Sequence, residues 1–169
     1  ELPIARLHRF QAAYGLSAYD AEVLVAERLT ADYYEQTLAA AAEISPKVVV
    51  NWITGELFAL LNQASLAIEA CPVSPPALAA LLQMVARGEI NQNTGKTVLG
   101  EMFQSGKTAA EIVAQRGLRQ VSDAQVISAL VAGVLADNPQ QVASYLQGKE
   151  TVSRWLFGQV MRLAKGQAN

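Results

Sequence analysis

Few residues in this sequence are of types that do covalent or metal chemistry. His8 is the only histidine and Cys71 the only cysteine among the 169 residues. A Ser-His-Asp or Cys-His arrangement would have to use His8, and a zinc site needs several His or Cys ligands. We expect His8 to be an exposed or helix-capping residue and Cys71 to be an ordinary small residue in a loop. The sequence therefore predicts no catalytic and no metal-binding residues.

Two triplets end like a phosphate-binding loop but lack the rest of it. Gly95-Lys96-Thr97 and Gly106-Lys107-Thr108 are not preceded by the first glycine and the strand of that motif. The acidic residues Asp20, Glu22 and Glu27 lie on or beside short predicted helices, where carboxylates are solvated and interact favourably with the helix dipole. We therefore predict neither a phosphate-binding glycine loop nor an acidic functional site from these residues.

The last predicted helix, over about residues 151–165, has two different faces. At about 100° per residue, its apolar side chains share one face that we expect to be core: Val152, Leu156, Val160 and Leu163. The opposite face carries a basic stripe interrupted by a glycine: Arg154, Gly158, Arg162 and Lys165. Lys149 and Arg119 are further candidates for the same cationic surface. We expect Trp155 to lie at the edge of the core rather than to stack on bases.

The glycine makes this stripe suggestive of nucleic-acid binding. A glycine inside a helix costs about 1 kcal/mol relative to alanine. A position without a side chain would let a nucleic-acid backbone approach the helix between two arginines. Two interpretations of the stripe therefore stay open, a nucleic-acid-binding face and a solvated face with a packing glycine.

The elements that would position these residues are helices along the whole chain, and no strand is predicted. Ser, Thr or Asn N-caps, prolines at the first helical turn and glycines after the last turn mark the ends. The predicted helices cover 18–26, 31–42, 46–63, 75–88, 94–105, 109–117, 123–136, 139–148 and 151–165. Within this series Thr30 is predicted to cap 31–42, and Thr108 with Glu111 to form a capping box.

These helices predict an all-α fold, a helical bundle domain followed by a smaller three-helix tail domain. The best boundary follows Gly117, because net charge changes there from −4 over residues 1–117 to +2 over 118–169. We expect residues 1–16 to be an irregular remnant of a connection from a preceding domain, 17–117 the helical domain and 118–169 the tail. No apolar run could span a membrane, and a single cysteine fits a cytoplasmic protein.

At its C-terminal end the chain resembles a known family. The stretch from Gly158 to Asn169 is similar to the C-terminal signature of the B subunit of aspartyl/glutamyl-tRNA amidotransferase, the GatB/YqeY domain. Asn138-Pro139 with Tyr145, Gly148 and Lys149 fits the same pattern. Glu1-Leu2-Pro3 with Arg6 and Arg9 resembles the end of that protein's catalytic domain. The resemblance covers nearly the whole chain.

The resemblance implies a tRNA-binding region rather than an enzyme. In the family, a cradle domain uses ATP and Mg²⁺ to amidate misacylated tRNA(Gln) or tRNA(Asn), together with the A and C subunits. The helical and tail domains hold the tRNA, and the tail reaches its elbow. The cradle is missing from this sequence, so the resemblance implies that this chain has no ATP site, no metal ligands and no catalytic activity by itself.

Two other functions remain open. The Ala- and Leu-rich helices would also suit a protein–protein docking module without RNA contact. A stand-alone YqeY-like protein is a third possibility, although the N-terminal residues argue against it.

Overall fold

In the computed structural model the chain is built from helices. The structure describes residues 1–41, 43–118 and 124–164, and these contain no strand, which confirms the all-α prediction. The chain divides into two compact units, Glu1–Gly117 and Leu118–Asn169. Each unit has its own core.

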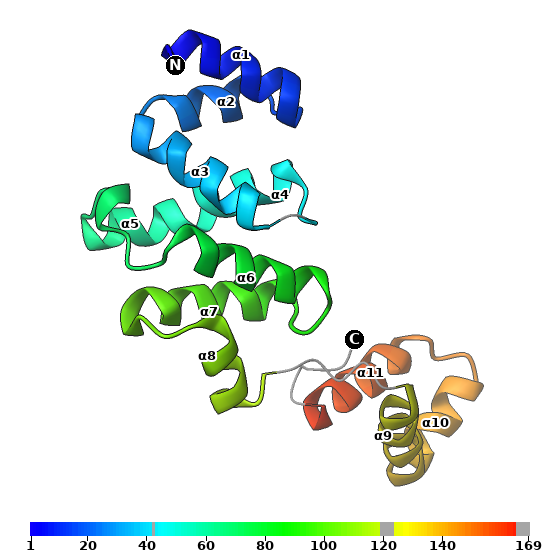
Figure 1. Cartoon of the computed structure of the whole chain (residues 1–169). Coiled ribbons are helices and arrows are strands. Elements are labelled where there is room, and N and C mark those ends of the chain that lie inside the picture. The colour runs from blue at the N-terminus through cyan, green and yellow to red at the C-terminus, as the bar shows by residue number, and fades with distance from the viewer. Residues whose placement is uncertain (42, 119–123, 165–169) are drawn as a thin grey trace. The chain divides into compact units, whose positions relative to one another are not determined.

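The larger unit is a stack of helices that follow one another along the chain (Figure 1). Its elements are α1 (Pro3–Tyr14), α2 (Ala18–Val25), α3 (Arg28–Ala40), α4 (Pro46–Asn51), the π-helical η1 (Trp52–Leu57), α5 (Phe58–Ala64), the short 3₁₀ helix η2 (Ile68–Ala70), α6 (Pro75–Ala86), α7 (Gln92–Ser105) and α8 (Ala109–Arg116). Contacts run from α1 to α2, from α2 to α3, from α3 to α6, and on through α7 to α8. Apolar side chains fill the spaces between these layers, with Phe10, Tyr34, Leu57 and Leu99 almost fully buried.

Capping side chains fix where several of these helices begin. Ser17 accepts a hydrogen bond from the backbone N–H of Asp20, and Ser74 and Asn91 do the same for α6 and α7. The predicted capping box is confirmed, because Thr108 and Glu111 each accept from the other's backbone N–H. These caps satisfy N–H groups that have no partner inside the helix.

Three local predictions differ from the structure. Residues 1–16 are not irregular, because Pro3 begins α1 and Gly15, at φ 64°, ends it inside the larger unit. His8, exposed as expected, lies on that helix. Thr30 does not cap a helix but lies within α3 and is 2% exposed. The long helix from Pro46 is present, but its middle turns widen into the π-helical segment η1.

The smaller unit contains α9 (Ala124–Asp137), α10 (Pro139–Leu146) and α11 (Thr151–Leu163), as the predicted three-helix tail requires. All three helices contact one another. The core is small and consists of Val134 from α9 with Leu156 and Val160 from α11. Leu130 and Val152 pack against it. This core decides which face of α11 is turned to solvent.

Candidate nucleic-acid interface

Helix α11 buries one face and exposes the opposite one. Leu156 and Val160 are 8% and 9% exposed, and Val152 packs beside them. The prediction that Leu163 belongs to this core is wrong, because Leu163 is 54% exposed. The next residue, Ala164, is buried in its place, so the covered side of the helix shifts around its axis at the C-terminal end.

The basic stripe lies on the solvent side of α11. Arg154, Gly158 and Arg162 are all exposed. The two arginines are eight positions apart in the sequence, which puts them about 12 Å apart along the helix axis with the glycine midway between them. Lys149, just before the helix, is also exposed. Lys165 and Arg119, which we predicted for the same surface, lie outside the described residues.

Gly158 is not required by packing within the described structure. An added Cβ at this position would meet no other atom within 4 Å. Gly95 in the larger unit shows the contrast, because its Cβ would meet the side chain of Val85 at 2.8 Å. Space above Gly158 is therefore open to a partner from solution.

The described cations of this surface are not held by acidic neighbours within the described structure. Among the residues that the structure describes, Lys149, Arg154 and Arg162 have no ion pair and no side-chain hydrogen bond. Negative charge in the described part of this unit is limited to Glu150, one turn before Arg154, and Asp137 at the end of α9. A phosphate could bind these side chains without displacing an existing partner.

In the larger unit most cations already have carboxylate partners. Six form ion pairs: Arg6 and Arg28 with Asp32, Arg9 with Glu35, Lys47 with Asp20, Lys96 with Glu56, and Arg116 with Glu101. Lys107 donates to the side chain of Gln115 instead. Arg87 is the exception, since it is exposed and unpaired among the described residues. The available positive charge is therefore concentrated in the smaller unit.

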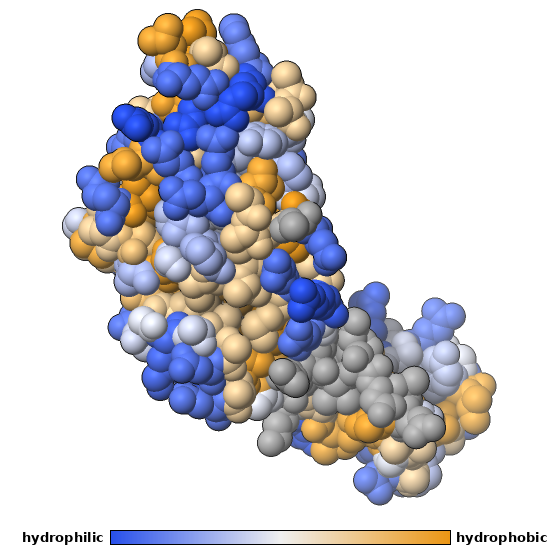
Figure 2. All heavy atoms as spheres, viewed as in Figure 1, coloured by the Kyte–Doolittle hydropathy of each residue, from blue (hydrophilic) through white to orange (hydrophobic). Residues whose placement is uncertain are grey.

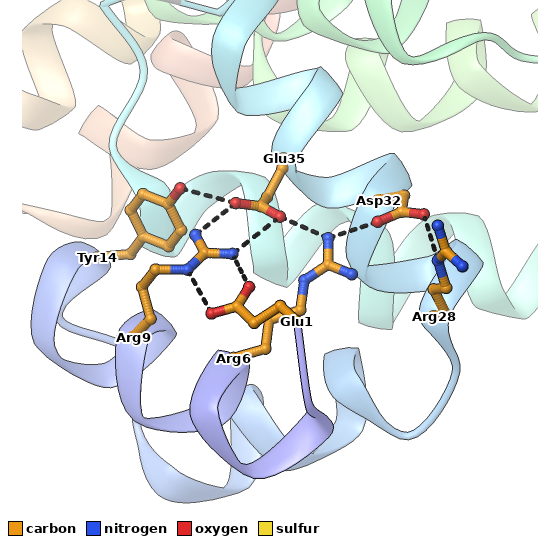
Figure 3. A network of polar contacts seen from close by, with 7 residues as sticks. All are labelled: Glu1, Arg6, Arg9, Tyr14, Arg28, Asp32 and Glu35. Carbon is orange, nitrogen blue, oxygen red and sulfur yellow. Dashed lines mark hydrogen bonds and ion pairs between the residues drawn. The ribbon is translucent and has the colours of Figure 1, made fainter.

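The densest group of ion pairs joins α1 to α3 (Figure 3). Glu35 lies between Arg6 and Arg9 and also accepts a hydrogen bond from the hydroxyl of Tyr14 at 3.2 Å. Hydrogen bonds from Arg9 and then Arg6 outweigh partial burial and lower the pKa of Glu35 from 4.5 to about 2. These arginines hold the N-terminal helix in place, so they are poor candidates for RNA contacts.

Two features of the smaller unit were not predicted. An open groove of about 470 Å³ runs between α9 and α11 and is lined entirely by apolar side chains, among them Val131, Leu135 and Phe157. Figure 2 shows hydrophobic side chains at the surface of this unit. Trp155 is 43% exposed, more than a position at the edge of a core requires. The absence of any charge between Ala124 and Ala136 was the sequence signal for the groove.

Other kinds of site find no support in the part of the chain that is described. No group of three or more His, Cys, Asp or Glu side chains there could hold a metal ion. No described helix is both long and apolar enough to cross a membrane.

Comparison with known proteins finds relatives of this chain among the subunits of tRNA amidotransferases. A family profile described as the GatB domain matches residues 32–169. Over its whole length the chain is 44% identical to the B subunit of the aspartyl/glutamyl-tRNA(Asn/Gln) amidotransferase of Syntrophotalea carbinolica, and 46% identical to that of Geobacter sulfurreducens. The corresponding protein of Rickettsia canadensis is 40% identical. The chain spans about a third of the length of these relatives, 35% for the first two and 34% for the third.

Proposed function

Because the chain belongs to the GatB domain family, we propose that it is the tRNA-binding region of an amidotransferase B subunit. In this proposal it holds misacylated tRNA(Gln) or tRNA(Asn) while other parts of the parent protein amidate it. The contact surface is the basic stripe of α11, formed by Arg154, Gly158, Arg162 and Lys165, with Lys149 and Arg119 extending it. The A and C subunits would be its further partners, in the cytoplasm.

One observation carries the proposal: on α11 two exposed arginines, Arg154 and Arg162, lie on either side of Gly158 and have no ion pair among the described residues, whereas most described cations of the larger unit are paired. RNA helices are recognised mainly through shape, phosphates and 2′-hydroxyls, which calls for cations and close approach rather than base-reading side chains. The stripe provides both. A few phosphate contacts give weak binding. A second tRNA-binding site elsewhere in the parent complex would raise the effective concentration of the tRNA at the stripe.

The test is tRNA binding measured by fluorescence anisotropy over a range of salt concentrations. We expect micromolar or weaker affinity for transcribed tRNA(Gln) or tRNA(Asn). With three to five phosphate contacts, the affinity should fall by about tenfold to a few hundredfold between 50 and 200 mM salt. The triple variant Arg154→Glu, Arg162→Glu, Lys165→Glu should abolish binding.

A matched control separates the stripe from net charge. Arg28→Glu, Lys47→Glu and Lys107→Glu together make the same change in charge on the exposed surface of the larger unit. This control should weaken binding far less than the stripe variant. Unchanged binding by the stripe variant, or equal losses in both, would defeat the proposed surface.

Catalysis and its cofactors belong elsewhere in this proposal. ATP and Mg²⁺ would bind to the cradle of the parent protein, and this chain would position the substrate. The purified chain should therefore neither hydrolyse ATP nor amidate Glu-tRNA(Gln). ATP turnover that copurifies with the chain through successive columns would contradict the assignment.

A second candidate function is docking to another protein through the apolar groove between α9 and α11. Its lining offers no charged group to a phosphate, whereas it could accept apolar side chains. The two functions use different sides of α11 and predict different results. If the unaltered chain shows no salt-dependent tRNA binding even at low salt, the docking function is favoured.

A further inference from the structure

Trp155 occupies an unusual place on α11. It is 43% exposed, although tryptophan is usually largely buried with its N–H hydrogen-bonded. Its indole N–H makes no hydrogen bond among the described residues. The other tryptophan, Trp52, is only 5% exposed in the core of the larger unit. Packing within the described chain thus leaves a large part of the Trp155 ring available to a partner.

The position of Trp155 around the helix connects it with the basic stripe. At about 100° per residue, Trp155 lies about 20° from Arg162 and about 60° from Gly158. Along the axis it is next to Arg154 at one end of the stripe. An RNA backbone that follows the stripe over Gly158 would therefore run beside the indole ring.

An aromatic ring beside arginines that have no ion pair among the described residues can bind a nucleobase by stacking. Base–aromatic stacking works with any base, because every base has a π-face. A base can reach such a ring only when it is not stacked in a duplex, which restricts the partner to loops, bulges or single-stranded ends.

We propose that Trp155 is a stacking platform for an unpaired nucleobase of the RNA whose phosphates contact the stripe. This inference rests on the proposed tRNA-binding function and adds to it a contact that does not involve charge. Arginines would hold the backbone, and Trp155 would select RNA in which a base is turned outwards.

Phe157 provides a matched control on the same helix. It is 66% exposed, more than Trp155, but it lies about 160° away around the axis and lines the apolar groove. Loss of this ring removes exposed aromatic surface from α11 without touching the Trp155 side of the stripe. Phe157→Ala therefore shows what a non-specific loss of apolar surface does.

The experiment compares tRNA affinity of the full chain and its variants at several salt concentrations. Trp155→Ala should reduce the affinity by about fivefold to a hundredfold at every salt concentration. The slope of log affinity against log salt should stay the same, because no phosphate contact is lost. Trp155→Phe should restore most of the affinity, whereas Trp155→Leu should not, since leucine is apolar without an aromatic face. Phe157→Ala should bind like the unaltered chain.

Each outcome decides between distinct explanations. Equal affinity of Trp155→Ala and the unaltered chain overturns the stacking platform and leaves the stripe intact. Full rescue by leucine shows that the position supports packing rather than stacking. If the unaltered chain itself binds no tRNA, the proposed function fails, and that result is distinguishable because it does not depend on any variant.

Tryptophan fluorescence distinguishes direct contact between Trp155 and a base from a purely structural role of Trp155. In Trp52→Phe, Trp155 is the only tryptophan, and tRNA should quench its emission as the base stacks on it. In Trp155→Phe, the emission of buried Trp52 should not respond. Circular dichroism establishes that each variant is folded, and the affinity series stands by itself if Trp52→Phe is unstable.

Discussion

At the scale of single residues, Gly158 lowers the stability of α11 but leaves room for an RNA backbone close to the helix. Gly158→Ala should stabilise the chain by about 0.5–1 kcal/mol, because alanine is the better helix former and its Cβ meets no atom within 4 Å. The same methyl group would stand between Arg154 and Arg162, so tRNA affinity should fall several-fold. Thermal unfolding followed by circular dichroism and the anisotropy assay measure the two effects.

Gly133 on α9 is the control for this prediction, because a Cβ there also meets nothing within 4 Å. Gly133→Ala should raise stability in the same way and leave tRNA binding unchanged. A Gly158→Ala variant that binds as tightly as the unaltered chain would show that the RNA backbone does not approach the helix there.

The residues of the candidate site were predictable in part. Helical periodicity correctly placed Arg154, Gly158 and Arg162 on the exposed face of α11. It failed at Leu163, which is exposed while Ala164 is buried, because periodicity gives the direction of a side chain but not what covers it. It also gave no indication that the larger unit's cations are paired, since partners such as Arg9 and Glu35 are far apart in sequence.

At the scale of elements, two glycines of α7 should respond oppositely to alanine. A Cβ at Gly95 would lie 2.8 Å from Val85 Cγ2 and 3.0 Å from Trp52 Cη2, and Trp52 is buried. We expect Gly95→Ala to cost about 1–3 kcal/mol through overpacking. Gly100, where a Cβ meets nothing within 4 Å, should gain about 0.5–1 kcal/mol in Gly100→Ala. Urea unfolding compares them, and equal effects would mean that α6 and α7 are not packed this closely.

The attachment of α1 to α3 should depend on pH. Because the pKa of Glu35 is lowered in the folded state, its carboxylate stabilises the fold above the ordinary value of 4.5, and this stability is lost as pH falls towards 2. Glu35→Gln should cost about 1–2 kcal/mol at pH 7, allowing for the solvent exposure of Arg9. The difference from the unaltered chain should shrink at pH 3.

Trp52 emission in a Trp155→Phe background reports unfolding of the larger unit alone. Glu22→Gln is the control, because Glu22 is exposed and makes no ion pair among the described residues. A difference between Glu35→Gln and the unaltered chain that is the same at both pH values would rule out the carboxylate as its origin.

Local signals explain which elements could be predicted. Caps such as Thr108 and glycine stops such as Gly106 act within a few residues, so the limits of α7 and α8 follow from sequence. Helix α1 has no side-chain cap, although Pro3 and Gly15 mark its ends. Sequence does not reveal its attachment to α3, because the ion pairs of Arg6 and Arg9 join residues far apart in the chain. The π-helical turns of η1 likewise leave no composition signal in an otherwise ordinary apolar run.

At the scale of the whole molecule, charge and core are divided differently between the two units. The larger unit carries a net charge of −4 and the smaller one +2, so the overall −2 conceals a local excess of positive charge. Buried apolar side chains, in contrast, are found mainly in the larger unit. Among the described residues, all of the largest fully buried side chains, such as Phe10, Tyr34 and Met102, belong to residues 1–117.

The smaller unit should therefore be the less stable one, because its described core consists of three buried residues, Val134, Leu156 and Val160, with partly buried residues packed against them. We expect calorimetry of the full chain to show two transitions, with the smaller unit unfolding at the lower temperature. A chain ending at Gly117 should keep the upper transition and its Trp52 emission, since its core is complete, but should no longer bind tRNA. An unfolded 1–117 chain would mean that the larger unit needs the smaller one to fold. Retained tRNA affinity would move the RNA contacts from α11 to the helices of the larger unit, where Arg87 and Lys107 are exposed cations without an ion pair among the described residues.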